Sequence, residues 1–573
     1  MRLDYAALPR DYERRFVPSK MSFEWGELEG LYGKLQRRGI NSVSDLESWL
    51  RDESELDSAV SEENRIRYVR NASQTDDSAY EKAYLQFVDE LEPRIKLKAF
   101  ELNKKYVSSP YHRALSKDYF VLDRSRENSV SLFRKQNVEL EKREAELTQR
   151  YLKLVGVMTV DYRGQRRTLY EMNVFSEDTD RGVRQEAWGL SEKRMLKDKN
   201  EIDRIYDGML KLRDSIAKNA GFGDYRDYAF REMERFDYTP QDCFRFHDAV
   251  ERYFVPLSRY LNEERKSSLK VESLRPWDLS VDPLGMPPLC PFATTEELVR
   301  GCAKIFERID ISFAKSFSRM VALNLLDLES RAGKAPGGFM IEFPDLRLPF
   351  IFMNSVGMDE DIWTLLHESG HAFHAFETRN SDLLFDYRSD GIPVEFSEVA
   401  STAMEFVGGE HLEGTFYSRE DARRSFLDQL KDVVQLFCSV ATIDSFQHWV
   451  YTHPGHTVEE REDEWVRTFR RFSVIEDWEG YEPQLRNRWQ NQPHLFDSPF
   501  YYIEYGIATL AALGIWLRYE DDPTGTIEGY RGALALGGSR PLPELFEAAG
   551  LRWDFGPATV SKSAGELQKA LNT

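Results

Sequence analysis

Apolar residues recur at three- and four-residue spacing between charged positions along most of the chain. This pattern is clear at 78–106, 130–155 and 180–268, where it predicts amphipathic helices that pack as hairpins through one apolar face. It returns at 295–330, where Thr294 and Thr295 are the candidate N-caps. These segments predict a mainly helical protein.

Three segments interrupt the helical pattern. Residues 157–170 contain Arg163-Gly164 between two short β-prone runs, which predicts a small hairpin. Residues 269–294 hold five prolines and predict a loop or hinge. Residues 339–354 follow a glycine-containing turn and predict two short strands around Pro344-Asp345. From 357 onward the pattern is again mostly helical, so we expect one small sheet before a long helical region.

Length and charge narrow the class of protein. A chain of 573 residues is too long for one ordinary core, so we expect two or more packed lobes. The formal net charge of −21 disfavours a nucleic-acid partner. No run approaches the roughly 20 apolar residues of a membrane span, and the N-terminus has no apolar signal core. The four cysteines are isolated, so we expect a cytoplasmic, reduced protein.

The segment 363–378, WTLLHESGHAFHAFET, contains an HExxH motif. His367 and His371 are one helical turn apart, so their rings lie on one face about 5–6 Å apart and can bind one Zn²⁺. Glu368 then lies beside the metal, where it can take a proton from zinc-bound water. Gly370 costs a helix about 1 kcal/mol relative to Ala, which predicts a close neighbour; strand 347–353 is our candidate.

His374 lies on the same predicted face, seven residues after His367. Three ligands from one straight helix would strain a tetrahedral site, so we expect His374 to face the substrate or to support a ligand. The metzincin pattern requires a glycine and a histidine further along, and this sequence has neither at the required positions, with Glu377 in place of the histidine.

A catalytic zinc usually has a third protein ligand. In segment 394–408, Glu398 and Glu405 fall on one polar stripe of an otherwise apolar helix. Glu398 as ligand and Glu405 as the acceptor that orients a ligating histidine would explain this stripe, although both could be surface glutamates. Spacing alone leaves Glu395 and Glu377 as alternatives to Glu398.

These motifs together resemble the oligoendopeptidase F and thimet oligopeptidase family of zinc metallopeptidases, in particular its Pz-peptidase-like branch. The resemblance covers roughly residues 180–573. It is carried by HESGHAFH, FSEVASTAMEF, LRDSIAKNAGFGDYRDYAF (212–230), RPWDL (275–279), PGGFMIEFPDLRLPFIFMN (336–354), PHLFDSPFYYIEYGIATLAALGIW (493–516) and ALGGSRPLPELFEAAGL (535–551).

The resemblance implies that Glu398 is the third ligand of a single Zn²⁺ per chain. It also implies a zincin-like, two-lobed helical body, with a small sheet next to the HExxH helix and a deep channel that admits short unstructured peptides. We expect residues 1–180 to form an N-terminal helical region and residues 181–573 to form the catalytic region. Glu368 would pass its proton to the leaving amine.

The segment 493–516 offers further catalytic candidates. Tyr501 and Tyr505 are four residues apart and would share one helical face, although core packing is the commoner fate of such aromatics. The family uses a histidine and tyrosines from this region to bind and stabilise the intermediate. The resemblance therefore assigns His494 and Tyr505 to catalysis, with Tyr501 or Tyr502 as the second tyrosine.

An exposed strand edge beside the zinc could pair with an extended peptide without reading its side chains. Gly337 and Gly338 would permit close backbone approach there, or would simply turn the chain. The sequence thus predicts a zinc-dependent oligoendopeptidase that acts on oligopeptides, with homo-oligomerisation left open.

Two alternatives remain. A zinc exopeptidase, of carboxypeptidase or dipeptidyl carboxypeptidase type, needs a basic residue for a free terminus, and Arg347, Arg388 and Lys334 lie in relevant segments. An inactive peptide-binding protein is the second alternative, although it would not need Glu368.

Overall fold

The computed structural model describes residues 4–10, 12–379, 383–473 and 476–572, and these form two compact units. Unit 1 comprises Met1–Ser131, Leu289–Phe426 and Ala508–Trp553, and unit 2 comprises Leu132–Pro288, Leu427–Ile507 and Asp554–Thr573. Each unit is therefore built from three separate parts of the chain. The predicted boundary at residue 180 separates two continuous regions of the sequence, whereas each unit combines three parts of the chain. The boundary therefore stays a prediction.

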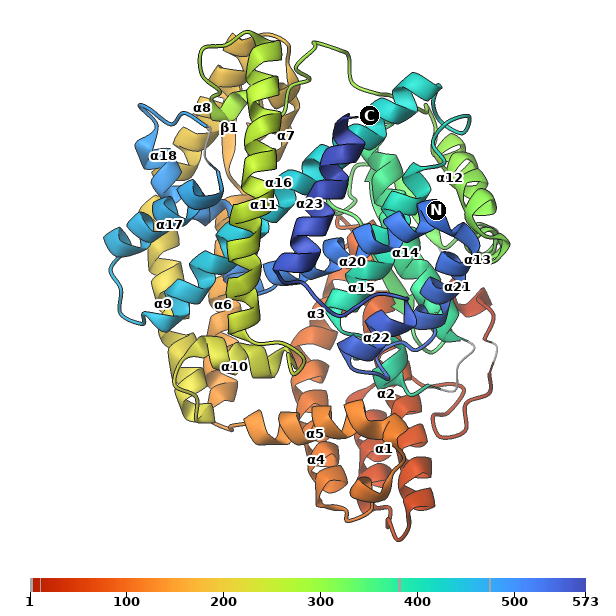
Figure 1. Ribbon diagram of the computed structural model, residues 1–573. Helices are drawn as coiled ribbons and strands as arrows, with labels where there is room; N and C mark the ends of the chain where they lie inside the picture. Colours follow the sequence, from red (N-terminus) through yellow and green to blue (C-terminus); the bar gives the residue numbers. More distant parts are fainter. Residues whose placement is uncertain (1–3, 11, 380–382, 474–475, 573) are drawn as a thin grey trace. The chain divides into compact units, whose positions relative to one another are not determined.

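The protein is mainly helical, as predicted, and Figure 1 labels most of its helices. The helices of unit 1 are α1 (Trp25–Arg37), α2 (Val43–Ser73), α3 (Ser78–Gln86), α4 (Glu92–Ser108), α12 (Thr295–Ile309), α13 (Ile311–Ala322), α14 (Asp359–Arg379), α15 (Val394–Gly409), α21 (Pro523–Leu534) and α22 (Leu542–Ala548). Of the two candidate N-caps before α12, Thr294 accepts a hydrogen bond from the Glu297 amide at 3.3 Å. Among the described residues, no helix is both long and apolar enough to cross a bilayer.

The helices of unit 2 are α6 (Asn137–Gly156), α7 (Leu169–Met172), α8 (Arg181–Lys197), α9 (Lys199–Ala220), α10 (Tyr225–Glu232), α11 (Pro240–Leu269), α17 (Val458–Phe472), α18 (Glu482–Asn487), α19 (His494–Asp497) and α23 (Pro557–Asn572). Three helices contribute residues to both units: α5 (Phe120–Leu132), α16 (Arg419–Thr452) and α20 (Tyr502–Asp521). The predicted helix at 130–155 is interrupted between α5 and α6. The predicted loop at 269–294 is confirmed, apart from one 3₁₀ turn at Pro276–Asp278.

The predicted hairpin at 157–170 is confirmed in unit 2. Strands β1 (Thr159–Tyr162) and β2 (Gln165–Thr168) pair antiparallel around Arg163-Gly164. Both turn residues have positive φ, 50° and 76°, which matches the twist that tight hairpins require.

A three-stranded sheet in unit 1 has the order β3-β5-β4. The two predicted strands are β4 (Phe339–Phe343) and β5 (Leu348–Ser355), which pair antiparallel from Phe339↔Phe352 to Phe343↔Leu348. The third strand, β3 (Leu326–Glu329), runs parallel to β5. The prediction of helix through residue 330 was therefore wrong beyond Ala322, where α13 ends. The central strand β5 is buried almost throughout, and β4 forms one edge of the sheet.

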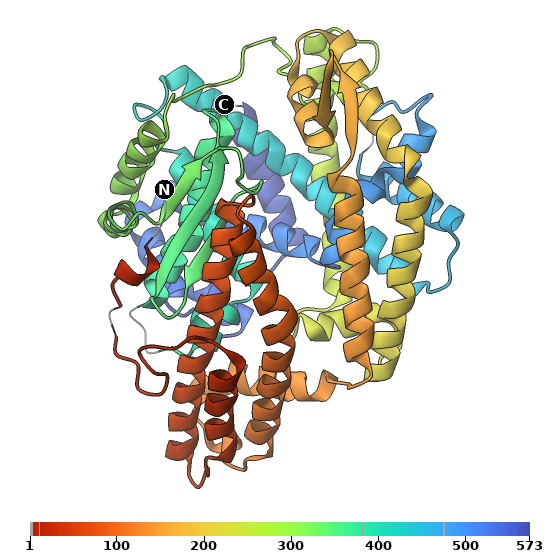
Figure 2. The same cartoon turned by 180° about the vertical axis from the view of Figure 1, so that it is seen from behind.

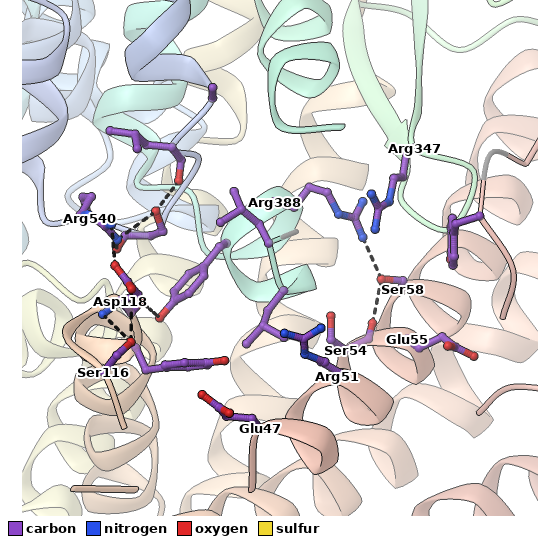
Figure 3. Close-up of a pocket in the computed structure, with 18 of the residues that line it drawn as sticks. Glu47, Arg51, Ser54, Glu55, Ser58, Ser116, Asp118, Arg347, Arg388 and Arg540 are labelled. Atoms are coloured by element: carbon purple, nitrogen blue, oxygen red, sulfur yellow. Dashed lines mark hydrogen bonds and ion pairs between the residues drawn. The ribbon is translucent and has the colours of Figure 1, made fainter. Parts of the chain in front are cut away.

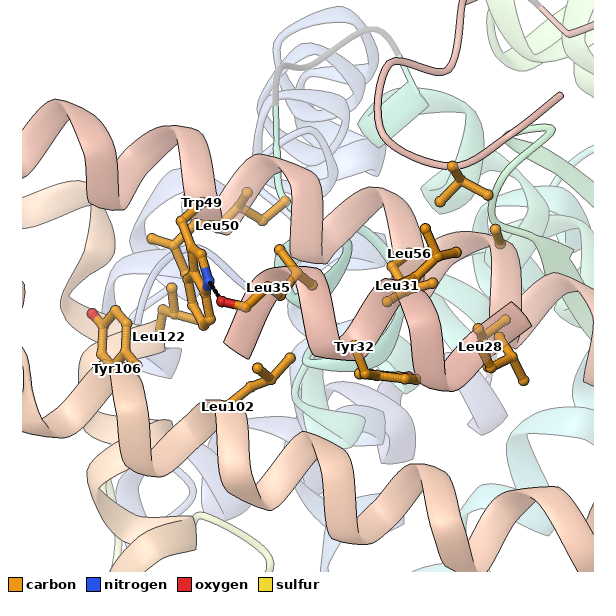
Figure 4. Close-up of a cluster of buried hydrophobic side chains, with 14 of the residues drawn as sticks. Leu28, Leu31, Tyr32, Leu35, Trp49, Leu50, Leu56, Leu102, Tyr106 and Leu122 are labelled. Atoms are coloured by element: carbon orange, nitrogen blue, oxygen red, sulfur yellow. Dashed lines mark hydrogen bonds between the residues drawn. The ribbon is translucent and has the colours of Figure 1, made fainter. Parts of the chain in front are cut away.

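The N-terminal helices form a hydrophobic core of their own in unit 1. Leu28, Tyr32 and Leu35 of α1 meet Trp49 of α2 and Leu102 of α4, all at 0–1% exposure (Figure 4). The Trp49 indole N–H donates to the Leu35 carbonyl oxygen at 2.9 Å, so this buried polar group has a partner. Helix α2 also packs on strand β4, and Figure 2 shows these N-terminal helices beside the sheet.

The closest helix pair in unit 1 is α14 against α15, which lie side by side in Figure 1. A Cβ atom built on Gly370 of α14 would lie 2.4 Å from the Ala400 carbonyl oxygen and 2.6 Å from the Ser401 Cα. The close neighbour of Gly370 is therefore the backbone of α15, and the prediction of strand 347–353 was wrong. On α15, Gly408 makes similar room for the Leu366 side chain. Small residues thus allow the two backbones to approach.

We predict that Gly370→Ala destabilises the protein by about 1–3 kcal/mol, because the new methyl group overlaps backbone that cannot move aside easily. The measurement is the urea midpoint and the Tm of the full chain. Gly532→Ala on α21 is the matched control, because its Cβ meets nothing within 4 Å and it should gain up to about 1 kcal/mol of helix stability. Equal stability of the two variants would contradict the packing described here.

Candidate metal centre

Three predicted ligands converge in unit 1. Helix α14 supplies His367 and His371, and α15 supplies Glu398. The two Nε2 atoms lie 3.5 and 3.7 Å from the same carboxylate oxygen, Glu398 Oε2. Ligands about 2.0–2.2 Å from one tetrahedral ion are about 3.3–3.6 Å apart, so this spacing fits a single Zn²⁺. All three side chains are partly exposed, so solvent reaches the site.

Several hydrogen bonds fix these three side chains. Glu405 Oε1 lies 2.7 Å from His367 Nδ1, and Ser397 Oγ lies 3.4 Å from His371 Nδ1. The Ser401 hydroxyl donates to Glu398 Oε2 at 3.0 Å. When His367 is neutral and its Nδ1 donates to Glu405, its lone pair lies on Nε2, the atom nearest Glu398. The role predicted for Glu405 therefore has the required geometry.

The start of α14 is also held firmly. Asp361 Oδ2 accepts the backbone N–H groups of Val356, Gly357 and Met358 at 2.8–2.9 Å. Asp359 accepts from the Trp363 indole at 3.1 Å and from the Ser425 hydroxyl at 2.7 Å. These contacts fix the histidine-bearing helix to the end of β5. The carboxylates thus do more than complement the helix dipole.

The electrostatics of the site favour a cation. Burial alone would lower the pKa of His367, but Glu405, Glu398 and Glu368 together raise it to about 9. The pKa of His371 is lowered well below its usual value, by burial and then by the charge of His367. One imidazole therefore attracts a proton while its neighbour has a free lone pair. A divalent ion would satisfy both nitrogens and the Glu398 oxygen at once.

Glu368 lies beside this triad and is only 7% exposed. Burial raises the pKa of its carboxyl group to about 7, although the charge of His367 and a hydrogen bond to the Met340 backbone oppose the shift. Met340 belongs to the edge strand β4. Such a pKa allows the carboxyl group to accept and release a proton near neutrality.

Among the described residues, the metal cluster includes neither Glu377 nor Glu395, the two alternatives to Glu398. Glu377 accepts from Arg531 Nε at 2.7 Å, and Glu395 is buried near the start of α15. His374 is 3% exposed, packs its ring against Phe396, and has its pKa lowered to about 3 by burial. A side chain so enclosed does not contact a peptide in this arrangement, so the structure gives no support for His374 as a substrate contact.

Gly337 and Gly338 lie directly before β4. Gly337 has φ of 93° and its carbonyl oxygen accepts from Asn354 Nδ2 at 2.9 Å. A Cβ atom on Gly338 would lie 3.3 Å from the Thr364 side chain of α14. The pair thus turns the chain tightly into the edge strand next to the motif helix, which is compatible with both predicted roles.

The basic residues that an exopeptidase would need have internal partners. Arg388 donates to Glu342, to the Pro344 carbonyl and to Ser58, and its Ser58 contact is drawn in Figure 3. Arg347 donates to the Arg379 carbonyl oxygen at 2.8 Å, and Lys334 is paired with Asp327 at 3.1 Å. Arg347 and Arg388 line a separate cavity of about 910 Å³, whose lining includes none of the predicted metal or catalytic residues.

The remaining predicted residues lie together in unit 2. The His494 ring is 5.1–6.2 Å from those of Tyr501, Tyr502 and Tyr505. The Tyr502 hydroxyl donates to Gln492 Oε1 at 3.1 Å. Because the cluster belongs to a different unit from the metal residues, its predicted catalytic role stays a prediction.

Sequence reasoning missed two residues that hold the site: Ser397, and Tyr530, whose hydroxyl donates to the Ala400 carbonyl at 2.7 Å. Ser397 directly precedes Glu398, which was the one available signal.

Comparisons with known proteins identify the family and the fold. A model of peptidase family M3 matches residues 174–562, and a model of the peptidase M3 N-terminal domain matches residues 23–130. A solved structure of Pz peptidase A with an inhibitor has a TM-score of 0.88 and 27% identity, over 98% of both chains. Oligoendopeptidase F from Enterococcus faecium shares the fold, with a TM-score of 0.66 and 16% identity over 96% of both chains.

Curated relatives match over shorter regions. An oligoendopeptidase F homologue of Borreliella burgdorferi is 24% identical over 43% of this chain and 42% of its own length. The chromosomal oligoendopeptidase F of Lactococcus lactis subsp. cremoris is 23% identical over 54% of this chain and 50% of its own. The alignments thus span about half the length of these relatives.

Proposed function

The chain belongs to peptidase family M3, and from this we propose that it is a zinc-dependent oligoendopeptidase that hydrolyses internal bonds of short, unstructured peptides. The observation that carries the proposal is the convergence of His367 Nε2, His371 Nε2 and Glu398 Oε2 within 4.8 Å of one another. Peptidases of this family are zinc-dependent in general. A cytoplasmic location, in keeping with the expectation from the sequence, is part of the proposal.

His367, His371 and Glu398 would hold one Zn²⁺. The fit is supported by the donor set itself, since both histidine Nε2 atoms lie 3.5–3.7 Å from the same carboxylate oxygen of Glu398. Zinc in such a site acts as a Lewis acid and lowers the pKa of water bound to it. Glu405 would keep the His367 lone pair directed at the ion, and Ser401 would do the same for the Glu398 carboxylate.

Glu368 is the proposed general base. Its carboxylate takes a proton as water attacks the scissile carbonyl carbon, and it then gives that proton to the leaving amine nitrogen. The raised pKa of about 7 suits both halves of this transfer. The edge strand β4, next to Glu368, would pair with an extended peptide through main-chain hydrogen bonds. Such pairing selects for extended conformation rather than for particular side chains.

The proposal favours endopeptidase over exopeptidase action. A terminal carboxylate needs a cation whose donors are available, and Arg347, Arg388 and Lys334 all make internal contacts. A strand edge recognises internal main chain equally well along a peptide. Neither feature requires a free peptide terminus.

We predict that the protein cleaves a quenched fluorescent peptide blocked at both termini, and that Glu368→Gln lowers kcat by at least about 10²–10⁴-fold while zinc content is unchanged. The amide keeps the size of the side chain but cannot accept the proton. Turnover and bound zinc are measured on the same samples, with and without a chelator.

Glu360→Gln is the control, because Glu360 is exposed on the same helix and should leave turnover unchanged. Turnover by Glu368→Gln at the wild-type rate would overturn the mechanism. Cleavage only of peptides with a free terminus would favour the exopeptidase alternative.

A second prediction concerns Glu405. Glu405→Gln should weaken zinc binding about 10- to 100-fold, because the neutral amide no longer orients His367 as a carboxylate does. Competition with a chelator of known affinity measures this change, with Glu360→Gln again as the control. An unchanged affinity would show that the hydrogen bond at 2.7 Å does not support the metal.

A further inference from the structure

A second cluster of ligating side chains lies in the interior of unit 2. It is built from two pairs at helical i, i+4 spacing, Cys243 and His247 on α11 and Asp444 and His448 on α16. Ligand atoms of Cys243, Asp444 and His448 all lie within 4.8 Å of one another, the same bound that describes the His367 centre. Residues one helical turn apart share a face, so each helix presents both of its side chains to the cluster.

The cluster contains buried polar atoms without hydrogen-bond partners. Asp444 Oδ1 and His448 Nδ1 are in this state, whereas His448 Nε2 lies 3.3 Å from Asp444 Oδ2. Each unpaired buried polar group costs about 1–3 kcal/mol. Asp444 is 0% exposed and His448 is 3% exposed, so bulk solvent does not satisfy these atoms.

The fourth residue orients the carboxylate. His247 Nε2 lies 2.7 Å from Asp444 Oδ2, which leaves Oδ1 for another partner. A hydrogen-bonded carboxylate that directs its second oxygen toward an ion is the usual arrangement around a protein-bound metal. Phe244 and Phe500 pack against the His448 ring at 4.8 and 5.3 Å, so the surroundings are apolar.

The charges also call for a cation. A divalent ion that displaces the thiol proton of Cys243 would be neutralised by one thiolate and the Asp444 carboxylate. The buried group would then carry no net charge.

We propose that Cys243, Asp444 and His448 form a second, structural Zn²⁺ site that fastens α11 to α16. Sulfur, nitrogen and oxygen donors from these three residue types are the ones that zinc prefers. A cysteine nucleophile is the competing interpretation of Cys, His and Asp together. Cys243 is 0% exposed, so no substrate can reach it. The site shares no residue with the His367 centre.

Cobalt exchange tests the proposal on the full chain, because Co²⁺ bound to a thiolate gives a sulfur-to-metal charge-transfer band. The His367 centre contains no cysteine, so this band reports on the second site alone. We expect the wild-type protein to bind two Co²⁺ per chain and to show the band. Cys243→Ser should abolish the band and lower the stoichiometry to one, while Cys302→Ser, at another buried cysteine, should keep both.

The circular dichroism spectrum of each variant establishes that it is folded, and His448→Gln provides a second variant should Cys243→Ser fail to fold. Absence of the band from wild-type protein that has taken up Co²⁺, or its survival in folded Cys243→Ser, would overturn the proposal. Loss of one metal in His371→Ala with the band intact would separate this site from the peptidase centre.

Discussion

The contact between the backbones of α14 and α15 is the constraint on which the candidate centre depends. The histidines belong to one helix and the glutamate to the other, so the site exists only while these helices stay close. Gly370 and Gly408 make this possible, since each leaves space that a side chain would fill. Tyr530 and Ser401 then fix the backbone and the carboxylate of α15. Glycine is a poorer helix former than alanine, but Gly370 lets the two ligand-bearing helices approach each other, which explains its presence in α14.

Burial distinguishes the His367 centre from the Cys243 cluster. Both bring ligand atoms within 4.8 Å, and both combine an i, i+4 pair on one helix with a residue from a second helix. The residues of the His367 centre are partly exposed, which an enzyme site requires because water and substrate must enter. The residues of the Cys243 cluster are buried, as a structural site requires. In each cluster a hydrogen bond with a residue outside the ligands, Glu405 or His247, fixes the orientation of one member.

Local patterns predicted much of the fold. The helix that carries HExxH, the turn at Arg163-Gly164 and the strands at 339–354 all follow from short-range spacing and turn chemistry, and the structure confirms them. Strand β3 was missed because its four residues include Asp327 and Glu329 and owe their conformation to pairing with β5. The neighbour of Gly370 was also misidentified. Short-range periodicity gives no information on which distant element packs against a given face.

The candidate site shows the same limit. Spacing alone could not choose among Glu398, Glu395 and Glu377, because the choice depends on how α15 packs on α14. The burial of His374 could likewise not be predicted, because His374 lies on the same helix face as His367. The interleaving of the two units along the chain has no local signature either.

The most direct test of the central claim is anomalous diffraction from a crystal of the full chain, recorded above and below the zinc absorption edge. The account predicts an anomalous peak at about 2.0–2.2 Å from His367 Nε2, His371 Nε2 and a Glu398 oxygen. Zinc-replete crystals with no peak among these three side chains would contradict it.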